Sequence, residues 1–325
     1  MTHDLLKQAI DFPPAEGPWA YFKSLEIEGA RCFGLRQTLD LTAPDAPEQP
    51  ARWTIILGEN GTGKTTLLQA LVGMRPLVRS YVNDNKSDTG WTVRPWVELD
   101  YQSIARQSAE VRFVAHYLFQ KKAEGQTQRL KVWANMRDSN PIASAWREPN
   151  SADMFQSVIF AYGAHRKINE IRTSNEYEAT EGYETLFSET VGLTDPAELI
   201  AQTYLVSKLG NGDEALQRER AEAKLEQLKA SLIRVLPDVH DVTIEVRENR
   251  PAVLFHTDYG KVRSSQLSSG YRAMAAWVGD LVGRMFDTYP DRDDPLSGPA
   301  IVLVDEFDLH MHPKWQRDAI AFLTE

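Results

Sequence analysis

The pattern of apolar and polar positions divides the chain into strand-like and helix-like stretches. Residues 21–41 alternate roughly between the two kinds, which predicts two short strands joined by a turn at Gly34. Residues 53–57 and 300–304 are nearly continuous apolar runs, typical of parallel strands buried on both faces. Two further short runs, 242–246 and 252–256, predict a hairpin. An α/β chain is therefore expected.

Several stretches have helical spacing instead. Helices are predicted over residues 65–74 and 271–286, and a last one from Pro313 onward. Residues 213–235 carry an apolar stripe of Leu225, Leu228, Leu232 and Val235. Because this stripe is shorter than about four heptads, we interpret it as a helix packed against the body of the protein, with a short interaction helix as the alternative.

The order of these stretches predicts three parts. Residues 1–80 hold the amino-terminal strands and a glycine-rich loop. Residues 81–240 are expected to form an inserted, largely helical lobe: short apolar runs alternate with polar loops up to about residue 184, and the helical stretch 213–235 follows. Residues 241–325 hold the hairpin, a serine-glycine turn and the second buried strand.

Composition excludes some classes of protein. The formal charge is −10, from 36 Lys+Arg against 46 Asp+Glu, so any DNA contact needs a local patch or a partner. No run of about 18 apolar residues and no basic leader is present, which indicates a cytoplasmic protein without membrane contact. The single cysteine, Cys32, allows neither an internal disulfide nor a cysteine zinc cluster.

A glycine-rich segment between the first buried strand and the next helix carries the clearest chemistry. Glycine tolerates positive φ and has no Cβ, so backbone amides can turn inward around a triphosphate at the positive end of the helix. Lys64 is expected to reach the β- and γ-phosphates of ATP, and the Thr65 hydroxyl to bind Mg²⁺. A plain glycine turn is the alternative. The predicted nucleotide-binding residues are Gly58, Glu59, Asn60, Gly61, Thr62, Gly63, Lys64, Thr65 and Thr66.

Two acidic residues follow the second buried strand. Asp305, at the carboxyl end of a parallel strand, would emerge beside the phosphate loop and complete the Mg²⁺ shell. Glu306 is then placed to polarise the attacking water as general base. An apolar run followed by two acids is common by itself. Combined with the glycine-rich loop, it predicts ATP hydrolysis with Lys64 and Glu306 as the catalytic residues.

A third motif, Leu-Ser-Ser-Gly-Tyr at residues 267–271, opens a predicted helix. Ser268 and the amide of Gly270 could bind the γ-phosphate there, although a serine at this position could serve only as an N-cap. His310 and His312 lie one residue apart, so we interpret them as turn or dimer-contact residues rather than a metal pair.

The order of the three motifs resembles that of ABC-type ATPases. With Arg31-Cys32-Phe33 in the amino-terminal strand, and with segments 58–65, 267–272 and 305–316, the chain looks like the RecF/SMC/OLD-like branch. Within that branch it is most similar to ATPases of Septu-type and retron-linked bacterial antiphage systems. The resemblance implies an ABC/SMC-head-like P-loop NTPase with a mainly parallel core sheet, an antiparallel β subdomain and a helical lobe.

The resemblance also implies a mechanism. Two copies would form a head-to-head dimer in which Ser268 and Gly270 of one copy close over ATP and Mg²⁺ held by Lys64 of the other, and hydrolysis would open it. Arg31 resembles an arginine that approaches the nucleotide in this branch, against the alternative of an ordinary surface arginine. The segment 162–166, Tyr-Gly-Ala-His-Arg, resembles a family segment near the site, without an assigned role.

The expected function is control of a nuclease effector in antiphage defence. The sequence shows no His-Asn-His cluster or second carboxylate centre, so the nuclease would be a separate chain or domain. The alternatives are a RecF-like DNA-repair ATPase, a transporter ATPase subunit, and an ATP clamp without hydrolysis.

The sequence departs from the family pattern at two places. Tyr271 replaces a usual glutamine or acid. The family also continues past the position of Glu325 to a switch histidine, so robust turnover is expected to need more than these 325 residues.

Overall fold

The computed structural model describes residues 19–83, 86–95, 105–106, 110–120, 127–137, 140–148, 157–169, 182–209, 215–247 and 250–309. By its internal contacts the chain divides into two compact units. The first is Met1–Ile159 with Pro299–Leu303, and the second is Phe160–Gly298 with Val304–Glu325. The expected boundaries after residues 80 and 240 do not coincide with this division; at the first of them, the strand over residues 111–120 pairs with the amino-terminal strand.

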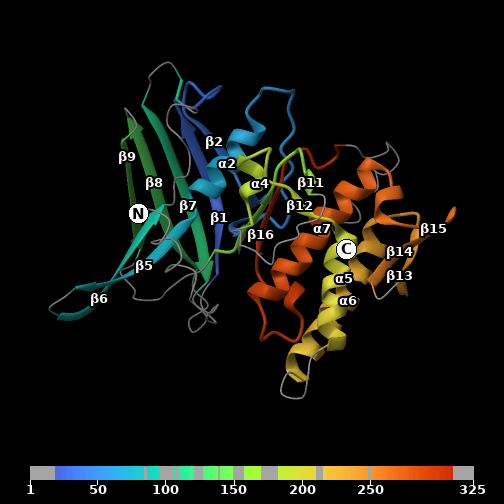
Figure 1. The fold of residues 1–325 in the computed structure, drawn as a ribbon. Coiled ribbons are helices and arrows are strands. Elements are labelled where there is room, and N and C mark those ends of the chain that lie inside the picture. The colour runs from blue at the N-terminus through green and yellow to red at the C-terminus, as the bar shows by residue number, and fades with distance from the viewer. Residues whose placement is uncertain are drawn as a thin grey trace. The chain divides into compact units, whose positions relative to one another are not determined.

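The first unit is built on a five-stranded sheet in the order β2-β1-β7-β8-β9 (Figure 1). Every neighbouring pair in this sheet is antiparallel, and Leu25 of β1 faces Leu39 of β2. The alternating residues Leu25, Ile27 and Phe113 are buried, so one face of the sheet forms a core. The strands are β1 Ala20–Glu28, β2 Gln37–Asp40, β7 Val111–Gln120, β8 Thr127–Arg137 and β9 Asn140–Glu148. The two predicted amino-terminal strands and the antiparallel subdomain are confirmed.

Two hairpins and one helix accompany this sheet in the first unit. β3 (Thr42–Ala43) pairs with β4 (Ala46–Pro50), and β5 (Pro76–Asn83) pairs with β6 (Lys86–Pro95). The helix α2 (Lys64–Gly73) confirms the helix predicted after the glycine-rich loop.

The expectation of a largely helical lobe over residues 81–240 is wrong for its first half. Almost all described residues from 86 to 148 lie in the strands β6 to β9. The sequence Val-Arg-Phe-Val-Ala-His-Tyr at the start of β7 is rich in β-branched and aromatic residues, which favour a pleated, half-buried surface. Only the second half contains the expected helices.

Residues 53–57 correct a second expectation. They form no strand, and Trp53, Ile55 and Leu57 are 47%, 58% and 89% exposed. An apolar run becomes a strand only when a neighbouring strand satisfies its backbone groups, and none of the described strands pairs with this segment. A mainly parallel core sheet is therefore not formed by the described residues.

Parallel pairing is present on a smaller scale. β10 (Ile159–Tyr162) and β16 (Ile301–Val304) form a two-stranded sheet, and β16 confirms the strand predicted over residues 300–304. The expectation that this strand is buried is wrong, because its residues are half-buried and Val302 is 39% exposed. β11 (Ile168–Asn169) pairs in parallel with β12 (Leu193–Thr194). The chain thus has the expected α/β class with mixed sheets.

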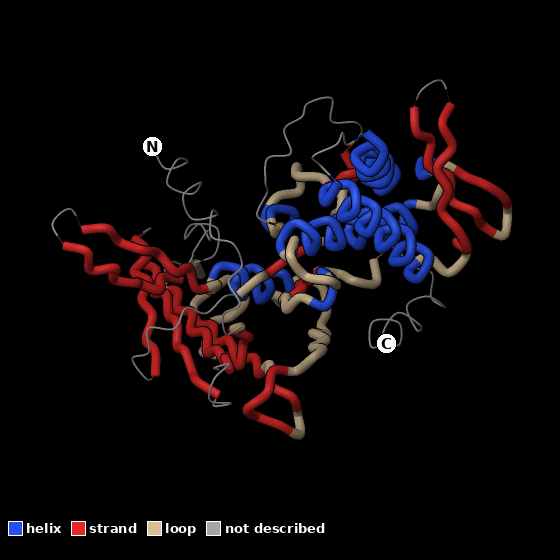
Figure 2. The backbone as a smooth tube through the Cα atoms, turned by 90° about the horizontal axis from the view of Figure 1, so that it is seen from below, coloured by secondary structure: helices blue, strands red, loops and turns tan. Residues whose placement is uncertain are grey.

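The second unit is dominated by three helices, drawn in blue in Figure 2 together with the shorter ones. They are α5 (Pro196–Leu209), α6 (Ala215–Val235) and α7 (Ser269–Thr288). The predicted stripe of α6 is buried, which confirms that this helix packs against the body of the unit. No helix in the described part of the chain combines the length and apolar character needed to cross a bilayer.

The remaining elements of this unit are short. The predicted hairpin is confirmed as β13 (Val239–Arg247) and β14 (Arg250–Thr257), extended by β15 (Gly260–Val262). A short helix, α4 (Glu184–Phe187), precedes β12. The helix predicted from Pro313 lies outside the described residues.

Candidate nucleotide-binding site

The glycine-rich loop leads directly into α2. Gly61 and Gly63 have φ of 81° and 98°, and Gly63 is the N-cap of the helix. The amide of Leu67 donates to the Gly63 carbonyl at 3.0 Å, so the amides before it in the first turn have no acceptor within the helix. No side chain caps this end, and its first turn has no acidic residue. Backbone donors and the helix dipole therefore favour an anion such as phosphate here.

A turn from the amino-terminal strand supports this loop at Gly63. A Cβ atom built at position 63 would lie 2.4 Å from Sγ of Cys32 and 2.5 Å from Cε2 of Phe33. The Cys32 thiol also donates a hydrogen bond to the Thr62 carbonyl at 3.2 Å. Position 63 therefore requires glycine for two reasons, its left-handed backbone and this close approach.

The catalytic lysine of the sequence prediction lies against the same loop. Nζ of Lys64 donates to the carbonyls of Gly58 and Glu59 at 2.7 and 2.9 Å. The Thr62 hydroxyl donates to the Glu59 carbonyl at 2.8 Å, which closes the loop on itself. The ammonium group is thus held beside the amides that are expected to bind phosphate.

The predicted nucleotide contact Arg31 belongs to the supporting turn. Its Nη1 donates to Oγ1 of Thr66 at 3.1 Å and to Oε1 of Gln69 at 3.2 Å. The residue has a φ of 43°, in the left-handed region. The structure thus joins Arg31 to the first turns of α2, and its contact with a nucleotide stays a prediction.

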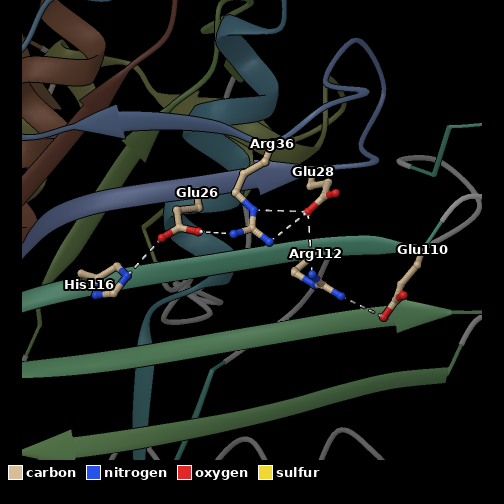
Figure 3. Close-up of polar contacts among 6 residues, drawn as sticks. All are labelled: Glu26, Glu28, Arg36, Glu110, Arg112 and His116. Carbon is tan, nitrogen blue, oxygen red and sulfur yellow. Dashed lines mark hydrogen bonds and ion pairs between the residues drawn. The ribbon is translucent and has the colours of Figure 1, made fainter.

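An ion-pair network lies where the residues on either side of this turn join the sheet. Arg36, after the turn, pairs with Glu26 at 3.7 Å and with Glu28 at 3.4 Å. Arg112 of β7 pairs with Glu28 at 3.8 Å. Figure 3 shows the whole network, which consists of Glu26, Glu28, Arg36, Glu110, Arg112 and His116.

The acidic motif of the second unit follows β16 in a tight turn. Asp305 is 5% exposed, and its amide donates to the Tyr162 carbonyl at 2.8 Å. Glu306 has a φ of 44°, and its carbonyl accepts from the Leu309 amide at 3.0 Å. The turn places the Glu306 side chain in contact with solvent while Asp305 is buried.

Arg166 is a site residue to which the sequence assigned no role. Its Nη2 donates to the carbonyls of Asp305 and Glu306 at 2.5 and 2.6 Å, and its Nε donates to the Gly163 carbonyl at 3.3 Å. Burial lowers the pKa of Arg166 to about 10, against the opposing charges of Asp305, Glu306 and Asp308. The only sequence signal was the family-like segment 162–166.

The third motif opens α7 as predicted. Oγ of Ser268 accepts a hydrogen bond from the Tyr271 amide at 3.4 Å, so the capping interpretation of this serine is confirmed. Ser268 is exposed and Gly270 is buried. The Tyr271 hydroxyl donates to the Asp238 carboxylate, and burial, together with this hydrogen bond, raises the pKa of Tyr271. A γ-phosphate contact of Ser268 and Gly270 stays a prediction.

The middle of α7 packs against the acidic turn. The ring of Trp277 lies 6.2 Å from that of Phe307, edge to face, and 5.6 Å from that of Tyr162. The Tyr162 hydroxyl donates to Oδ2 of Asp280 at 2.9 Å, and Nε of Arg284 donates to the same oxygen at 2.6 Å. Aromatic packing and the hydrogen bond from Tyr162 to Asp280 therefore connect α7 to β10, and the Trp277–Phe307 contact connects it to the residues after Glu306.

The predicted site residues fall into two groups. The first unit brings together Arg31, Lys64 and the rest of the phosphate loop, and the second brings together Arg166, Asp305 and Glu306. The pairing of Thr65 with Asp305 around Mg²⁺ stays a prediction. Among the described residues no group of three or more His, Cys, Asp or Glu side chains could hold a metal ion. His310 and His312 lie outside the described residues.

The phosphate loop at the start of α2, together with the buried aspartate and exposed glutamate after β16, is typical of a P-loop nucleotide-binding domain. A family model described as "AAA domain" matches residues 24–239. The chain belongs to this family.

Three curated proteins are similar to this chain. Retron Vc95 probable ATPase of Vibrio cholerae serotype O1 biovar El Tor is 30% identical over 156 residues, which cover 48% of this chain and 30% of that protein. Septu protein PtuA of Bacillus mycoides (strain KBAB4) is 23% identical over 308 residues, 94% of this chain and 36% of that protein. Retron Ec83 probable ATPase of Escherichia coli is 44% identical over 60 residues, 18% of this chain and 11% of that protein.

These matches confirm the resemblance to retron-linked and Septu-type ATPases. The chain spans between 11% and 36% of the length of these relatives.

Proposed function

We propose that this chain is an ABC/SMC-head-like ATPase that binds and hydrolyses ATP, dimerises around it, and regulates a nuclease effector in bacterial antiphage defence. The observation that carries the proposal is the phosphate loop: Gly61 and Gly63 lie in the left-handed region, and Lys64 contacts the loop at the amino terminus of α2. Backbone amides, a helix dipole and an ammonium group there suit a triphosphate.

The first unit would hold the nucleotide. The loop amides and Lys64 would bind the β- and γ-phosphates, and the absence of side chains at Gly61 and Gly63 lets the backbone approach them. Thr65 and Asp305 would hold Mg²⁺. When bound, this ion neutralises charge on the phosphate oxygens. A hydroxyl and a carboxylate are the oxygen donors that Mg²⁺ prefers.

Glu306 would supply the general base. Its side chain is exposed, so water can reach the carboxylate. In the reaction the water oxygen attacks the γ-phosphorus, its proton passes to Glu306, and the bond from phosphorus to the ADP oxygen breaks. The presence of Glu306 as a base next to the buried Asp305 favours ATP hydrolysis over the alternative of an ATP clamp without hydrolysis.

Dimerisation would use the start of α7. Ser268 is exposed at the N-cap of a 20-residue helix, and the helix dipole there favours an anion. We infer that Ser268 and Gly270 of one copy close over ATP held by Lys64 of another. The capping bond to the Tyr271 amide fixes the serine where its hydroxyl can still donate to phosphate.

The defence function is supported by the names of the relatives, two retron ATPases and a Septu protein. In this proposal a nuclease in a separate chain or domain is the effector, and DNA is contacted through a local patch or that partner. The acidic balance of the chain is consistent with indirect DNA contact.

Steady-state hydrolysis of ATP by the full-length protein tests the proposal, with and without linear duplex DNA. Lys64→Ala should abolish nucleotide binding, and Glu306→Gln should keep binding but stop turnover and accumulate a dimer by light scattering. Ser268→Arg should bind ATP as a monomer.

Unchanged ATP affinity in Lys64→Ala would refute the assignment of the phosphate loop as the nucleotide-binding site. Stimulation by DNA without any nuclease partner would favour a repair ATPase instead.

A further inference from the structure

Arg166 lies behind the turn that carries Glu306. It is 5% exposed, and among the residues whose side chains the structure describes, it and Asp305 are the only buried charged residues. Burying a guanidinium is costly unless its donors are satisfied. A buried arginine at this place therefore calls for an explanation.

The donors of Arg166 hold the backbone. Nη2 donates to two consecutive carbonyls, those of Asp305 and Glu306, at 2.5 and 2.6 Å. Successive carbonyls of an extended strand point in opposite directions, so one nitrogen can reach both only where the chain turns sharply. That turn is the left-handed φ of 44° at Glu306, a conformation that residues other than glycine seldom adopt.

The backbone at Arg166, the donor of these hydrogen bonds, is unusual as well. Arg166 itself has a φ of 32°, and its Nε donates to the Gly163 carbonyl three residues earlier. A Cβ atom at Gly163 would lie 2.0 Å from the Thr185 carbonyl oxygen, so the segment before Arg166 is also closely packed. Strained residues of this kind persist only where the surroundings hold them, and they cluster at functional sites.

We propose that Arg166 is a positioning residue that fixes the backbone of the Asp305–Glu306 turn and thereby directs the Glu306 carboxylate toward solvent and substrate. This inference rests on the proposed role of Glu306 as general base. Without the two hydrogen bonds from Arg166, the turn loses the donor that joins its two carbonyls. The Glu306 side chain would then adopt several orientations, and the rate of ATP hydrolysis would fall. The phosphate loop, in the first unit, would bind ATP as before.

Arg166→Gln and Arg166→Lys in the full-length protein test this role. Arg166→Gln should lower kcat by about 30-fold or more, with the KM and Kd for ATP within about threefold, as expected for a group that acts only in the transition state. Arg166→Lys keeps a charged donor and should lose only about three- to tenfold in kcat. Hydrogen exchange of amides 305–309 should become about tenfold faster in Arg166→Gln, because the turn opens more often.

Arg284→Gln is the matched control, since Arg284 is a second arginine of the same unit with low exposure and its Nε bonds to Asp280. This variant measures how far kcat and ATP affinity fall when a guanidinium of low exposure is removed. Equal losses of kcat and ATP affinity in Arg284→Gln and Arg166→Gln would overturn the proposal, as would turnover and exchange of Arg166→Gln at the level of the unchanged protein. If Arg166→Gln does not fold, Arg166→Lys carries the same comparison.

The experiment separates this inference from the proposed function. Full turnover by Glu306→Gln would refute Glu306 as the base, whatever Arg166 does. The hydrogen-exchange measurement does not depend on turnover, so it still decides whether Arg166 holds the turn.

Discussion

The sulfur of Cys32 approaches Gly63 so closely that a Cβ atom at position 63 would lie only 2.4 Å from it. The thiol also donates to the carbonyl of Thr62, 30 residues further along the chain. The turn after β1 thus packs directly against the phosphate loop. Changes on either side of this contact should alter nucleotide binding.

Gly63→Ala should destabilise the protein more than Gly61→Ala. Both positions have positive φ, which costs a residue other than glycine about 1–2 kcal/mol. A Cβ at position 61 meets nothing within 4 Å, whereas one at 63 meets Cys32 and Phe33, which adds about 1–3 kcal/mol of overpacking. Urea unfolding measures the difference, and ATP titration should show the larger loss of affinity for Gly63→Ala. Equal stabilities would contradict the contact.

Alkylation of Cys32 should weaken ATP binding. Cys32 is exposed and is the single cysteine of the chain, so a maleimide modifies one place. The added group would press on Thr62 and Gly63, and we expect ATP affinity to fall by about tenfold, or about 1.4 kcal/mol. ATP with Mg²⁺ should slow the labelling. Cys32→Ser is the control, since it keeps the size of the side chain and resists the reagent. Equal affinity of labelled and unlabelled protein would refute the prediction.

Arg31→Ala tests the predicted nucleotide contact. If the guanidinium approaches phosphate, its removal costs a charge-assisted hydrogen bond of about 1.5–3 kcal/mol, which is about 10-fold or more in ATP affinity. Gln69→Leu is the control, because it removes one protein partner of Arg31 and leaves the charge in place. If both variants lose affinity equally, Arg31 acts by holding α2.

The ion-pair network of Figure 3 should contribute little to stability. The paired side chains of Glu28 and Arg36 are 36% and 54% exposed, so solvent screens their attraction. Glu28→Gln should lower the free energy of unfolding by no more than about 1 kcal/mol. This loss should vanish near 1 M salt, where the Debye length is about 3 Å. A double-mutant cycle with Arg36→Gln isolates the pair, and a coupling that survives high salt would show that the network is effectively buried.

Tyr117 should make stability fall at alkaline pH. Burial raises its pKa well above the ordinary value of 10.0, and its hydroxyl donates to the Met74 carbonyl at 3.0 Å. The folded state keeps this proton while the unfolded state releases it, so stability present below about pH 10 is lost as the pH rises.

Relative to pH 8, the loss from this group should reach about 1.4 kcal/mol near pH 11. Tyr117→Phe should lack this part of the pH dependence in urea unfolding, and Tyr259→Phe, at an 89% exposed site, is the control for removing a surface hydroxyl. Parallel pH profiles for Tyr117→Phe and the unchanged protein would contradict the prediction.

The sequence could predict the parts of the site that are local. The glycines that precede α2, the strand before Asp305 and the serine cap of α7 each depend on residues a few positions apart, and all three are present. Residues 53–57 show the limit of such reasoning. Their apolar pattern is that of a buried strand, yet strand formation depends on a pairing partner that no local pattern encodes.

By itself, therefore, the sequence determined the glycine turn that leads into α2, the two acids that follow a strand, and the amino-terminal strands, because short-range spacing and backbone preference decide them. Only the tertiary structure decided that Arg166 holds the carbonyls of Asp305 and Glu306, 139 and 140 residues away, and that Arg31 joins Thr66 and Gln69. Hydrogen bonds of this kind depend on the path of the whole chain, since each partner meets the other only after the sheets and helices between them have packed.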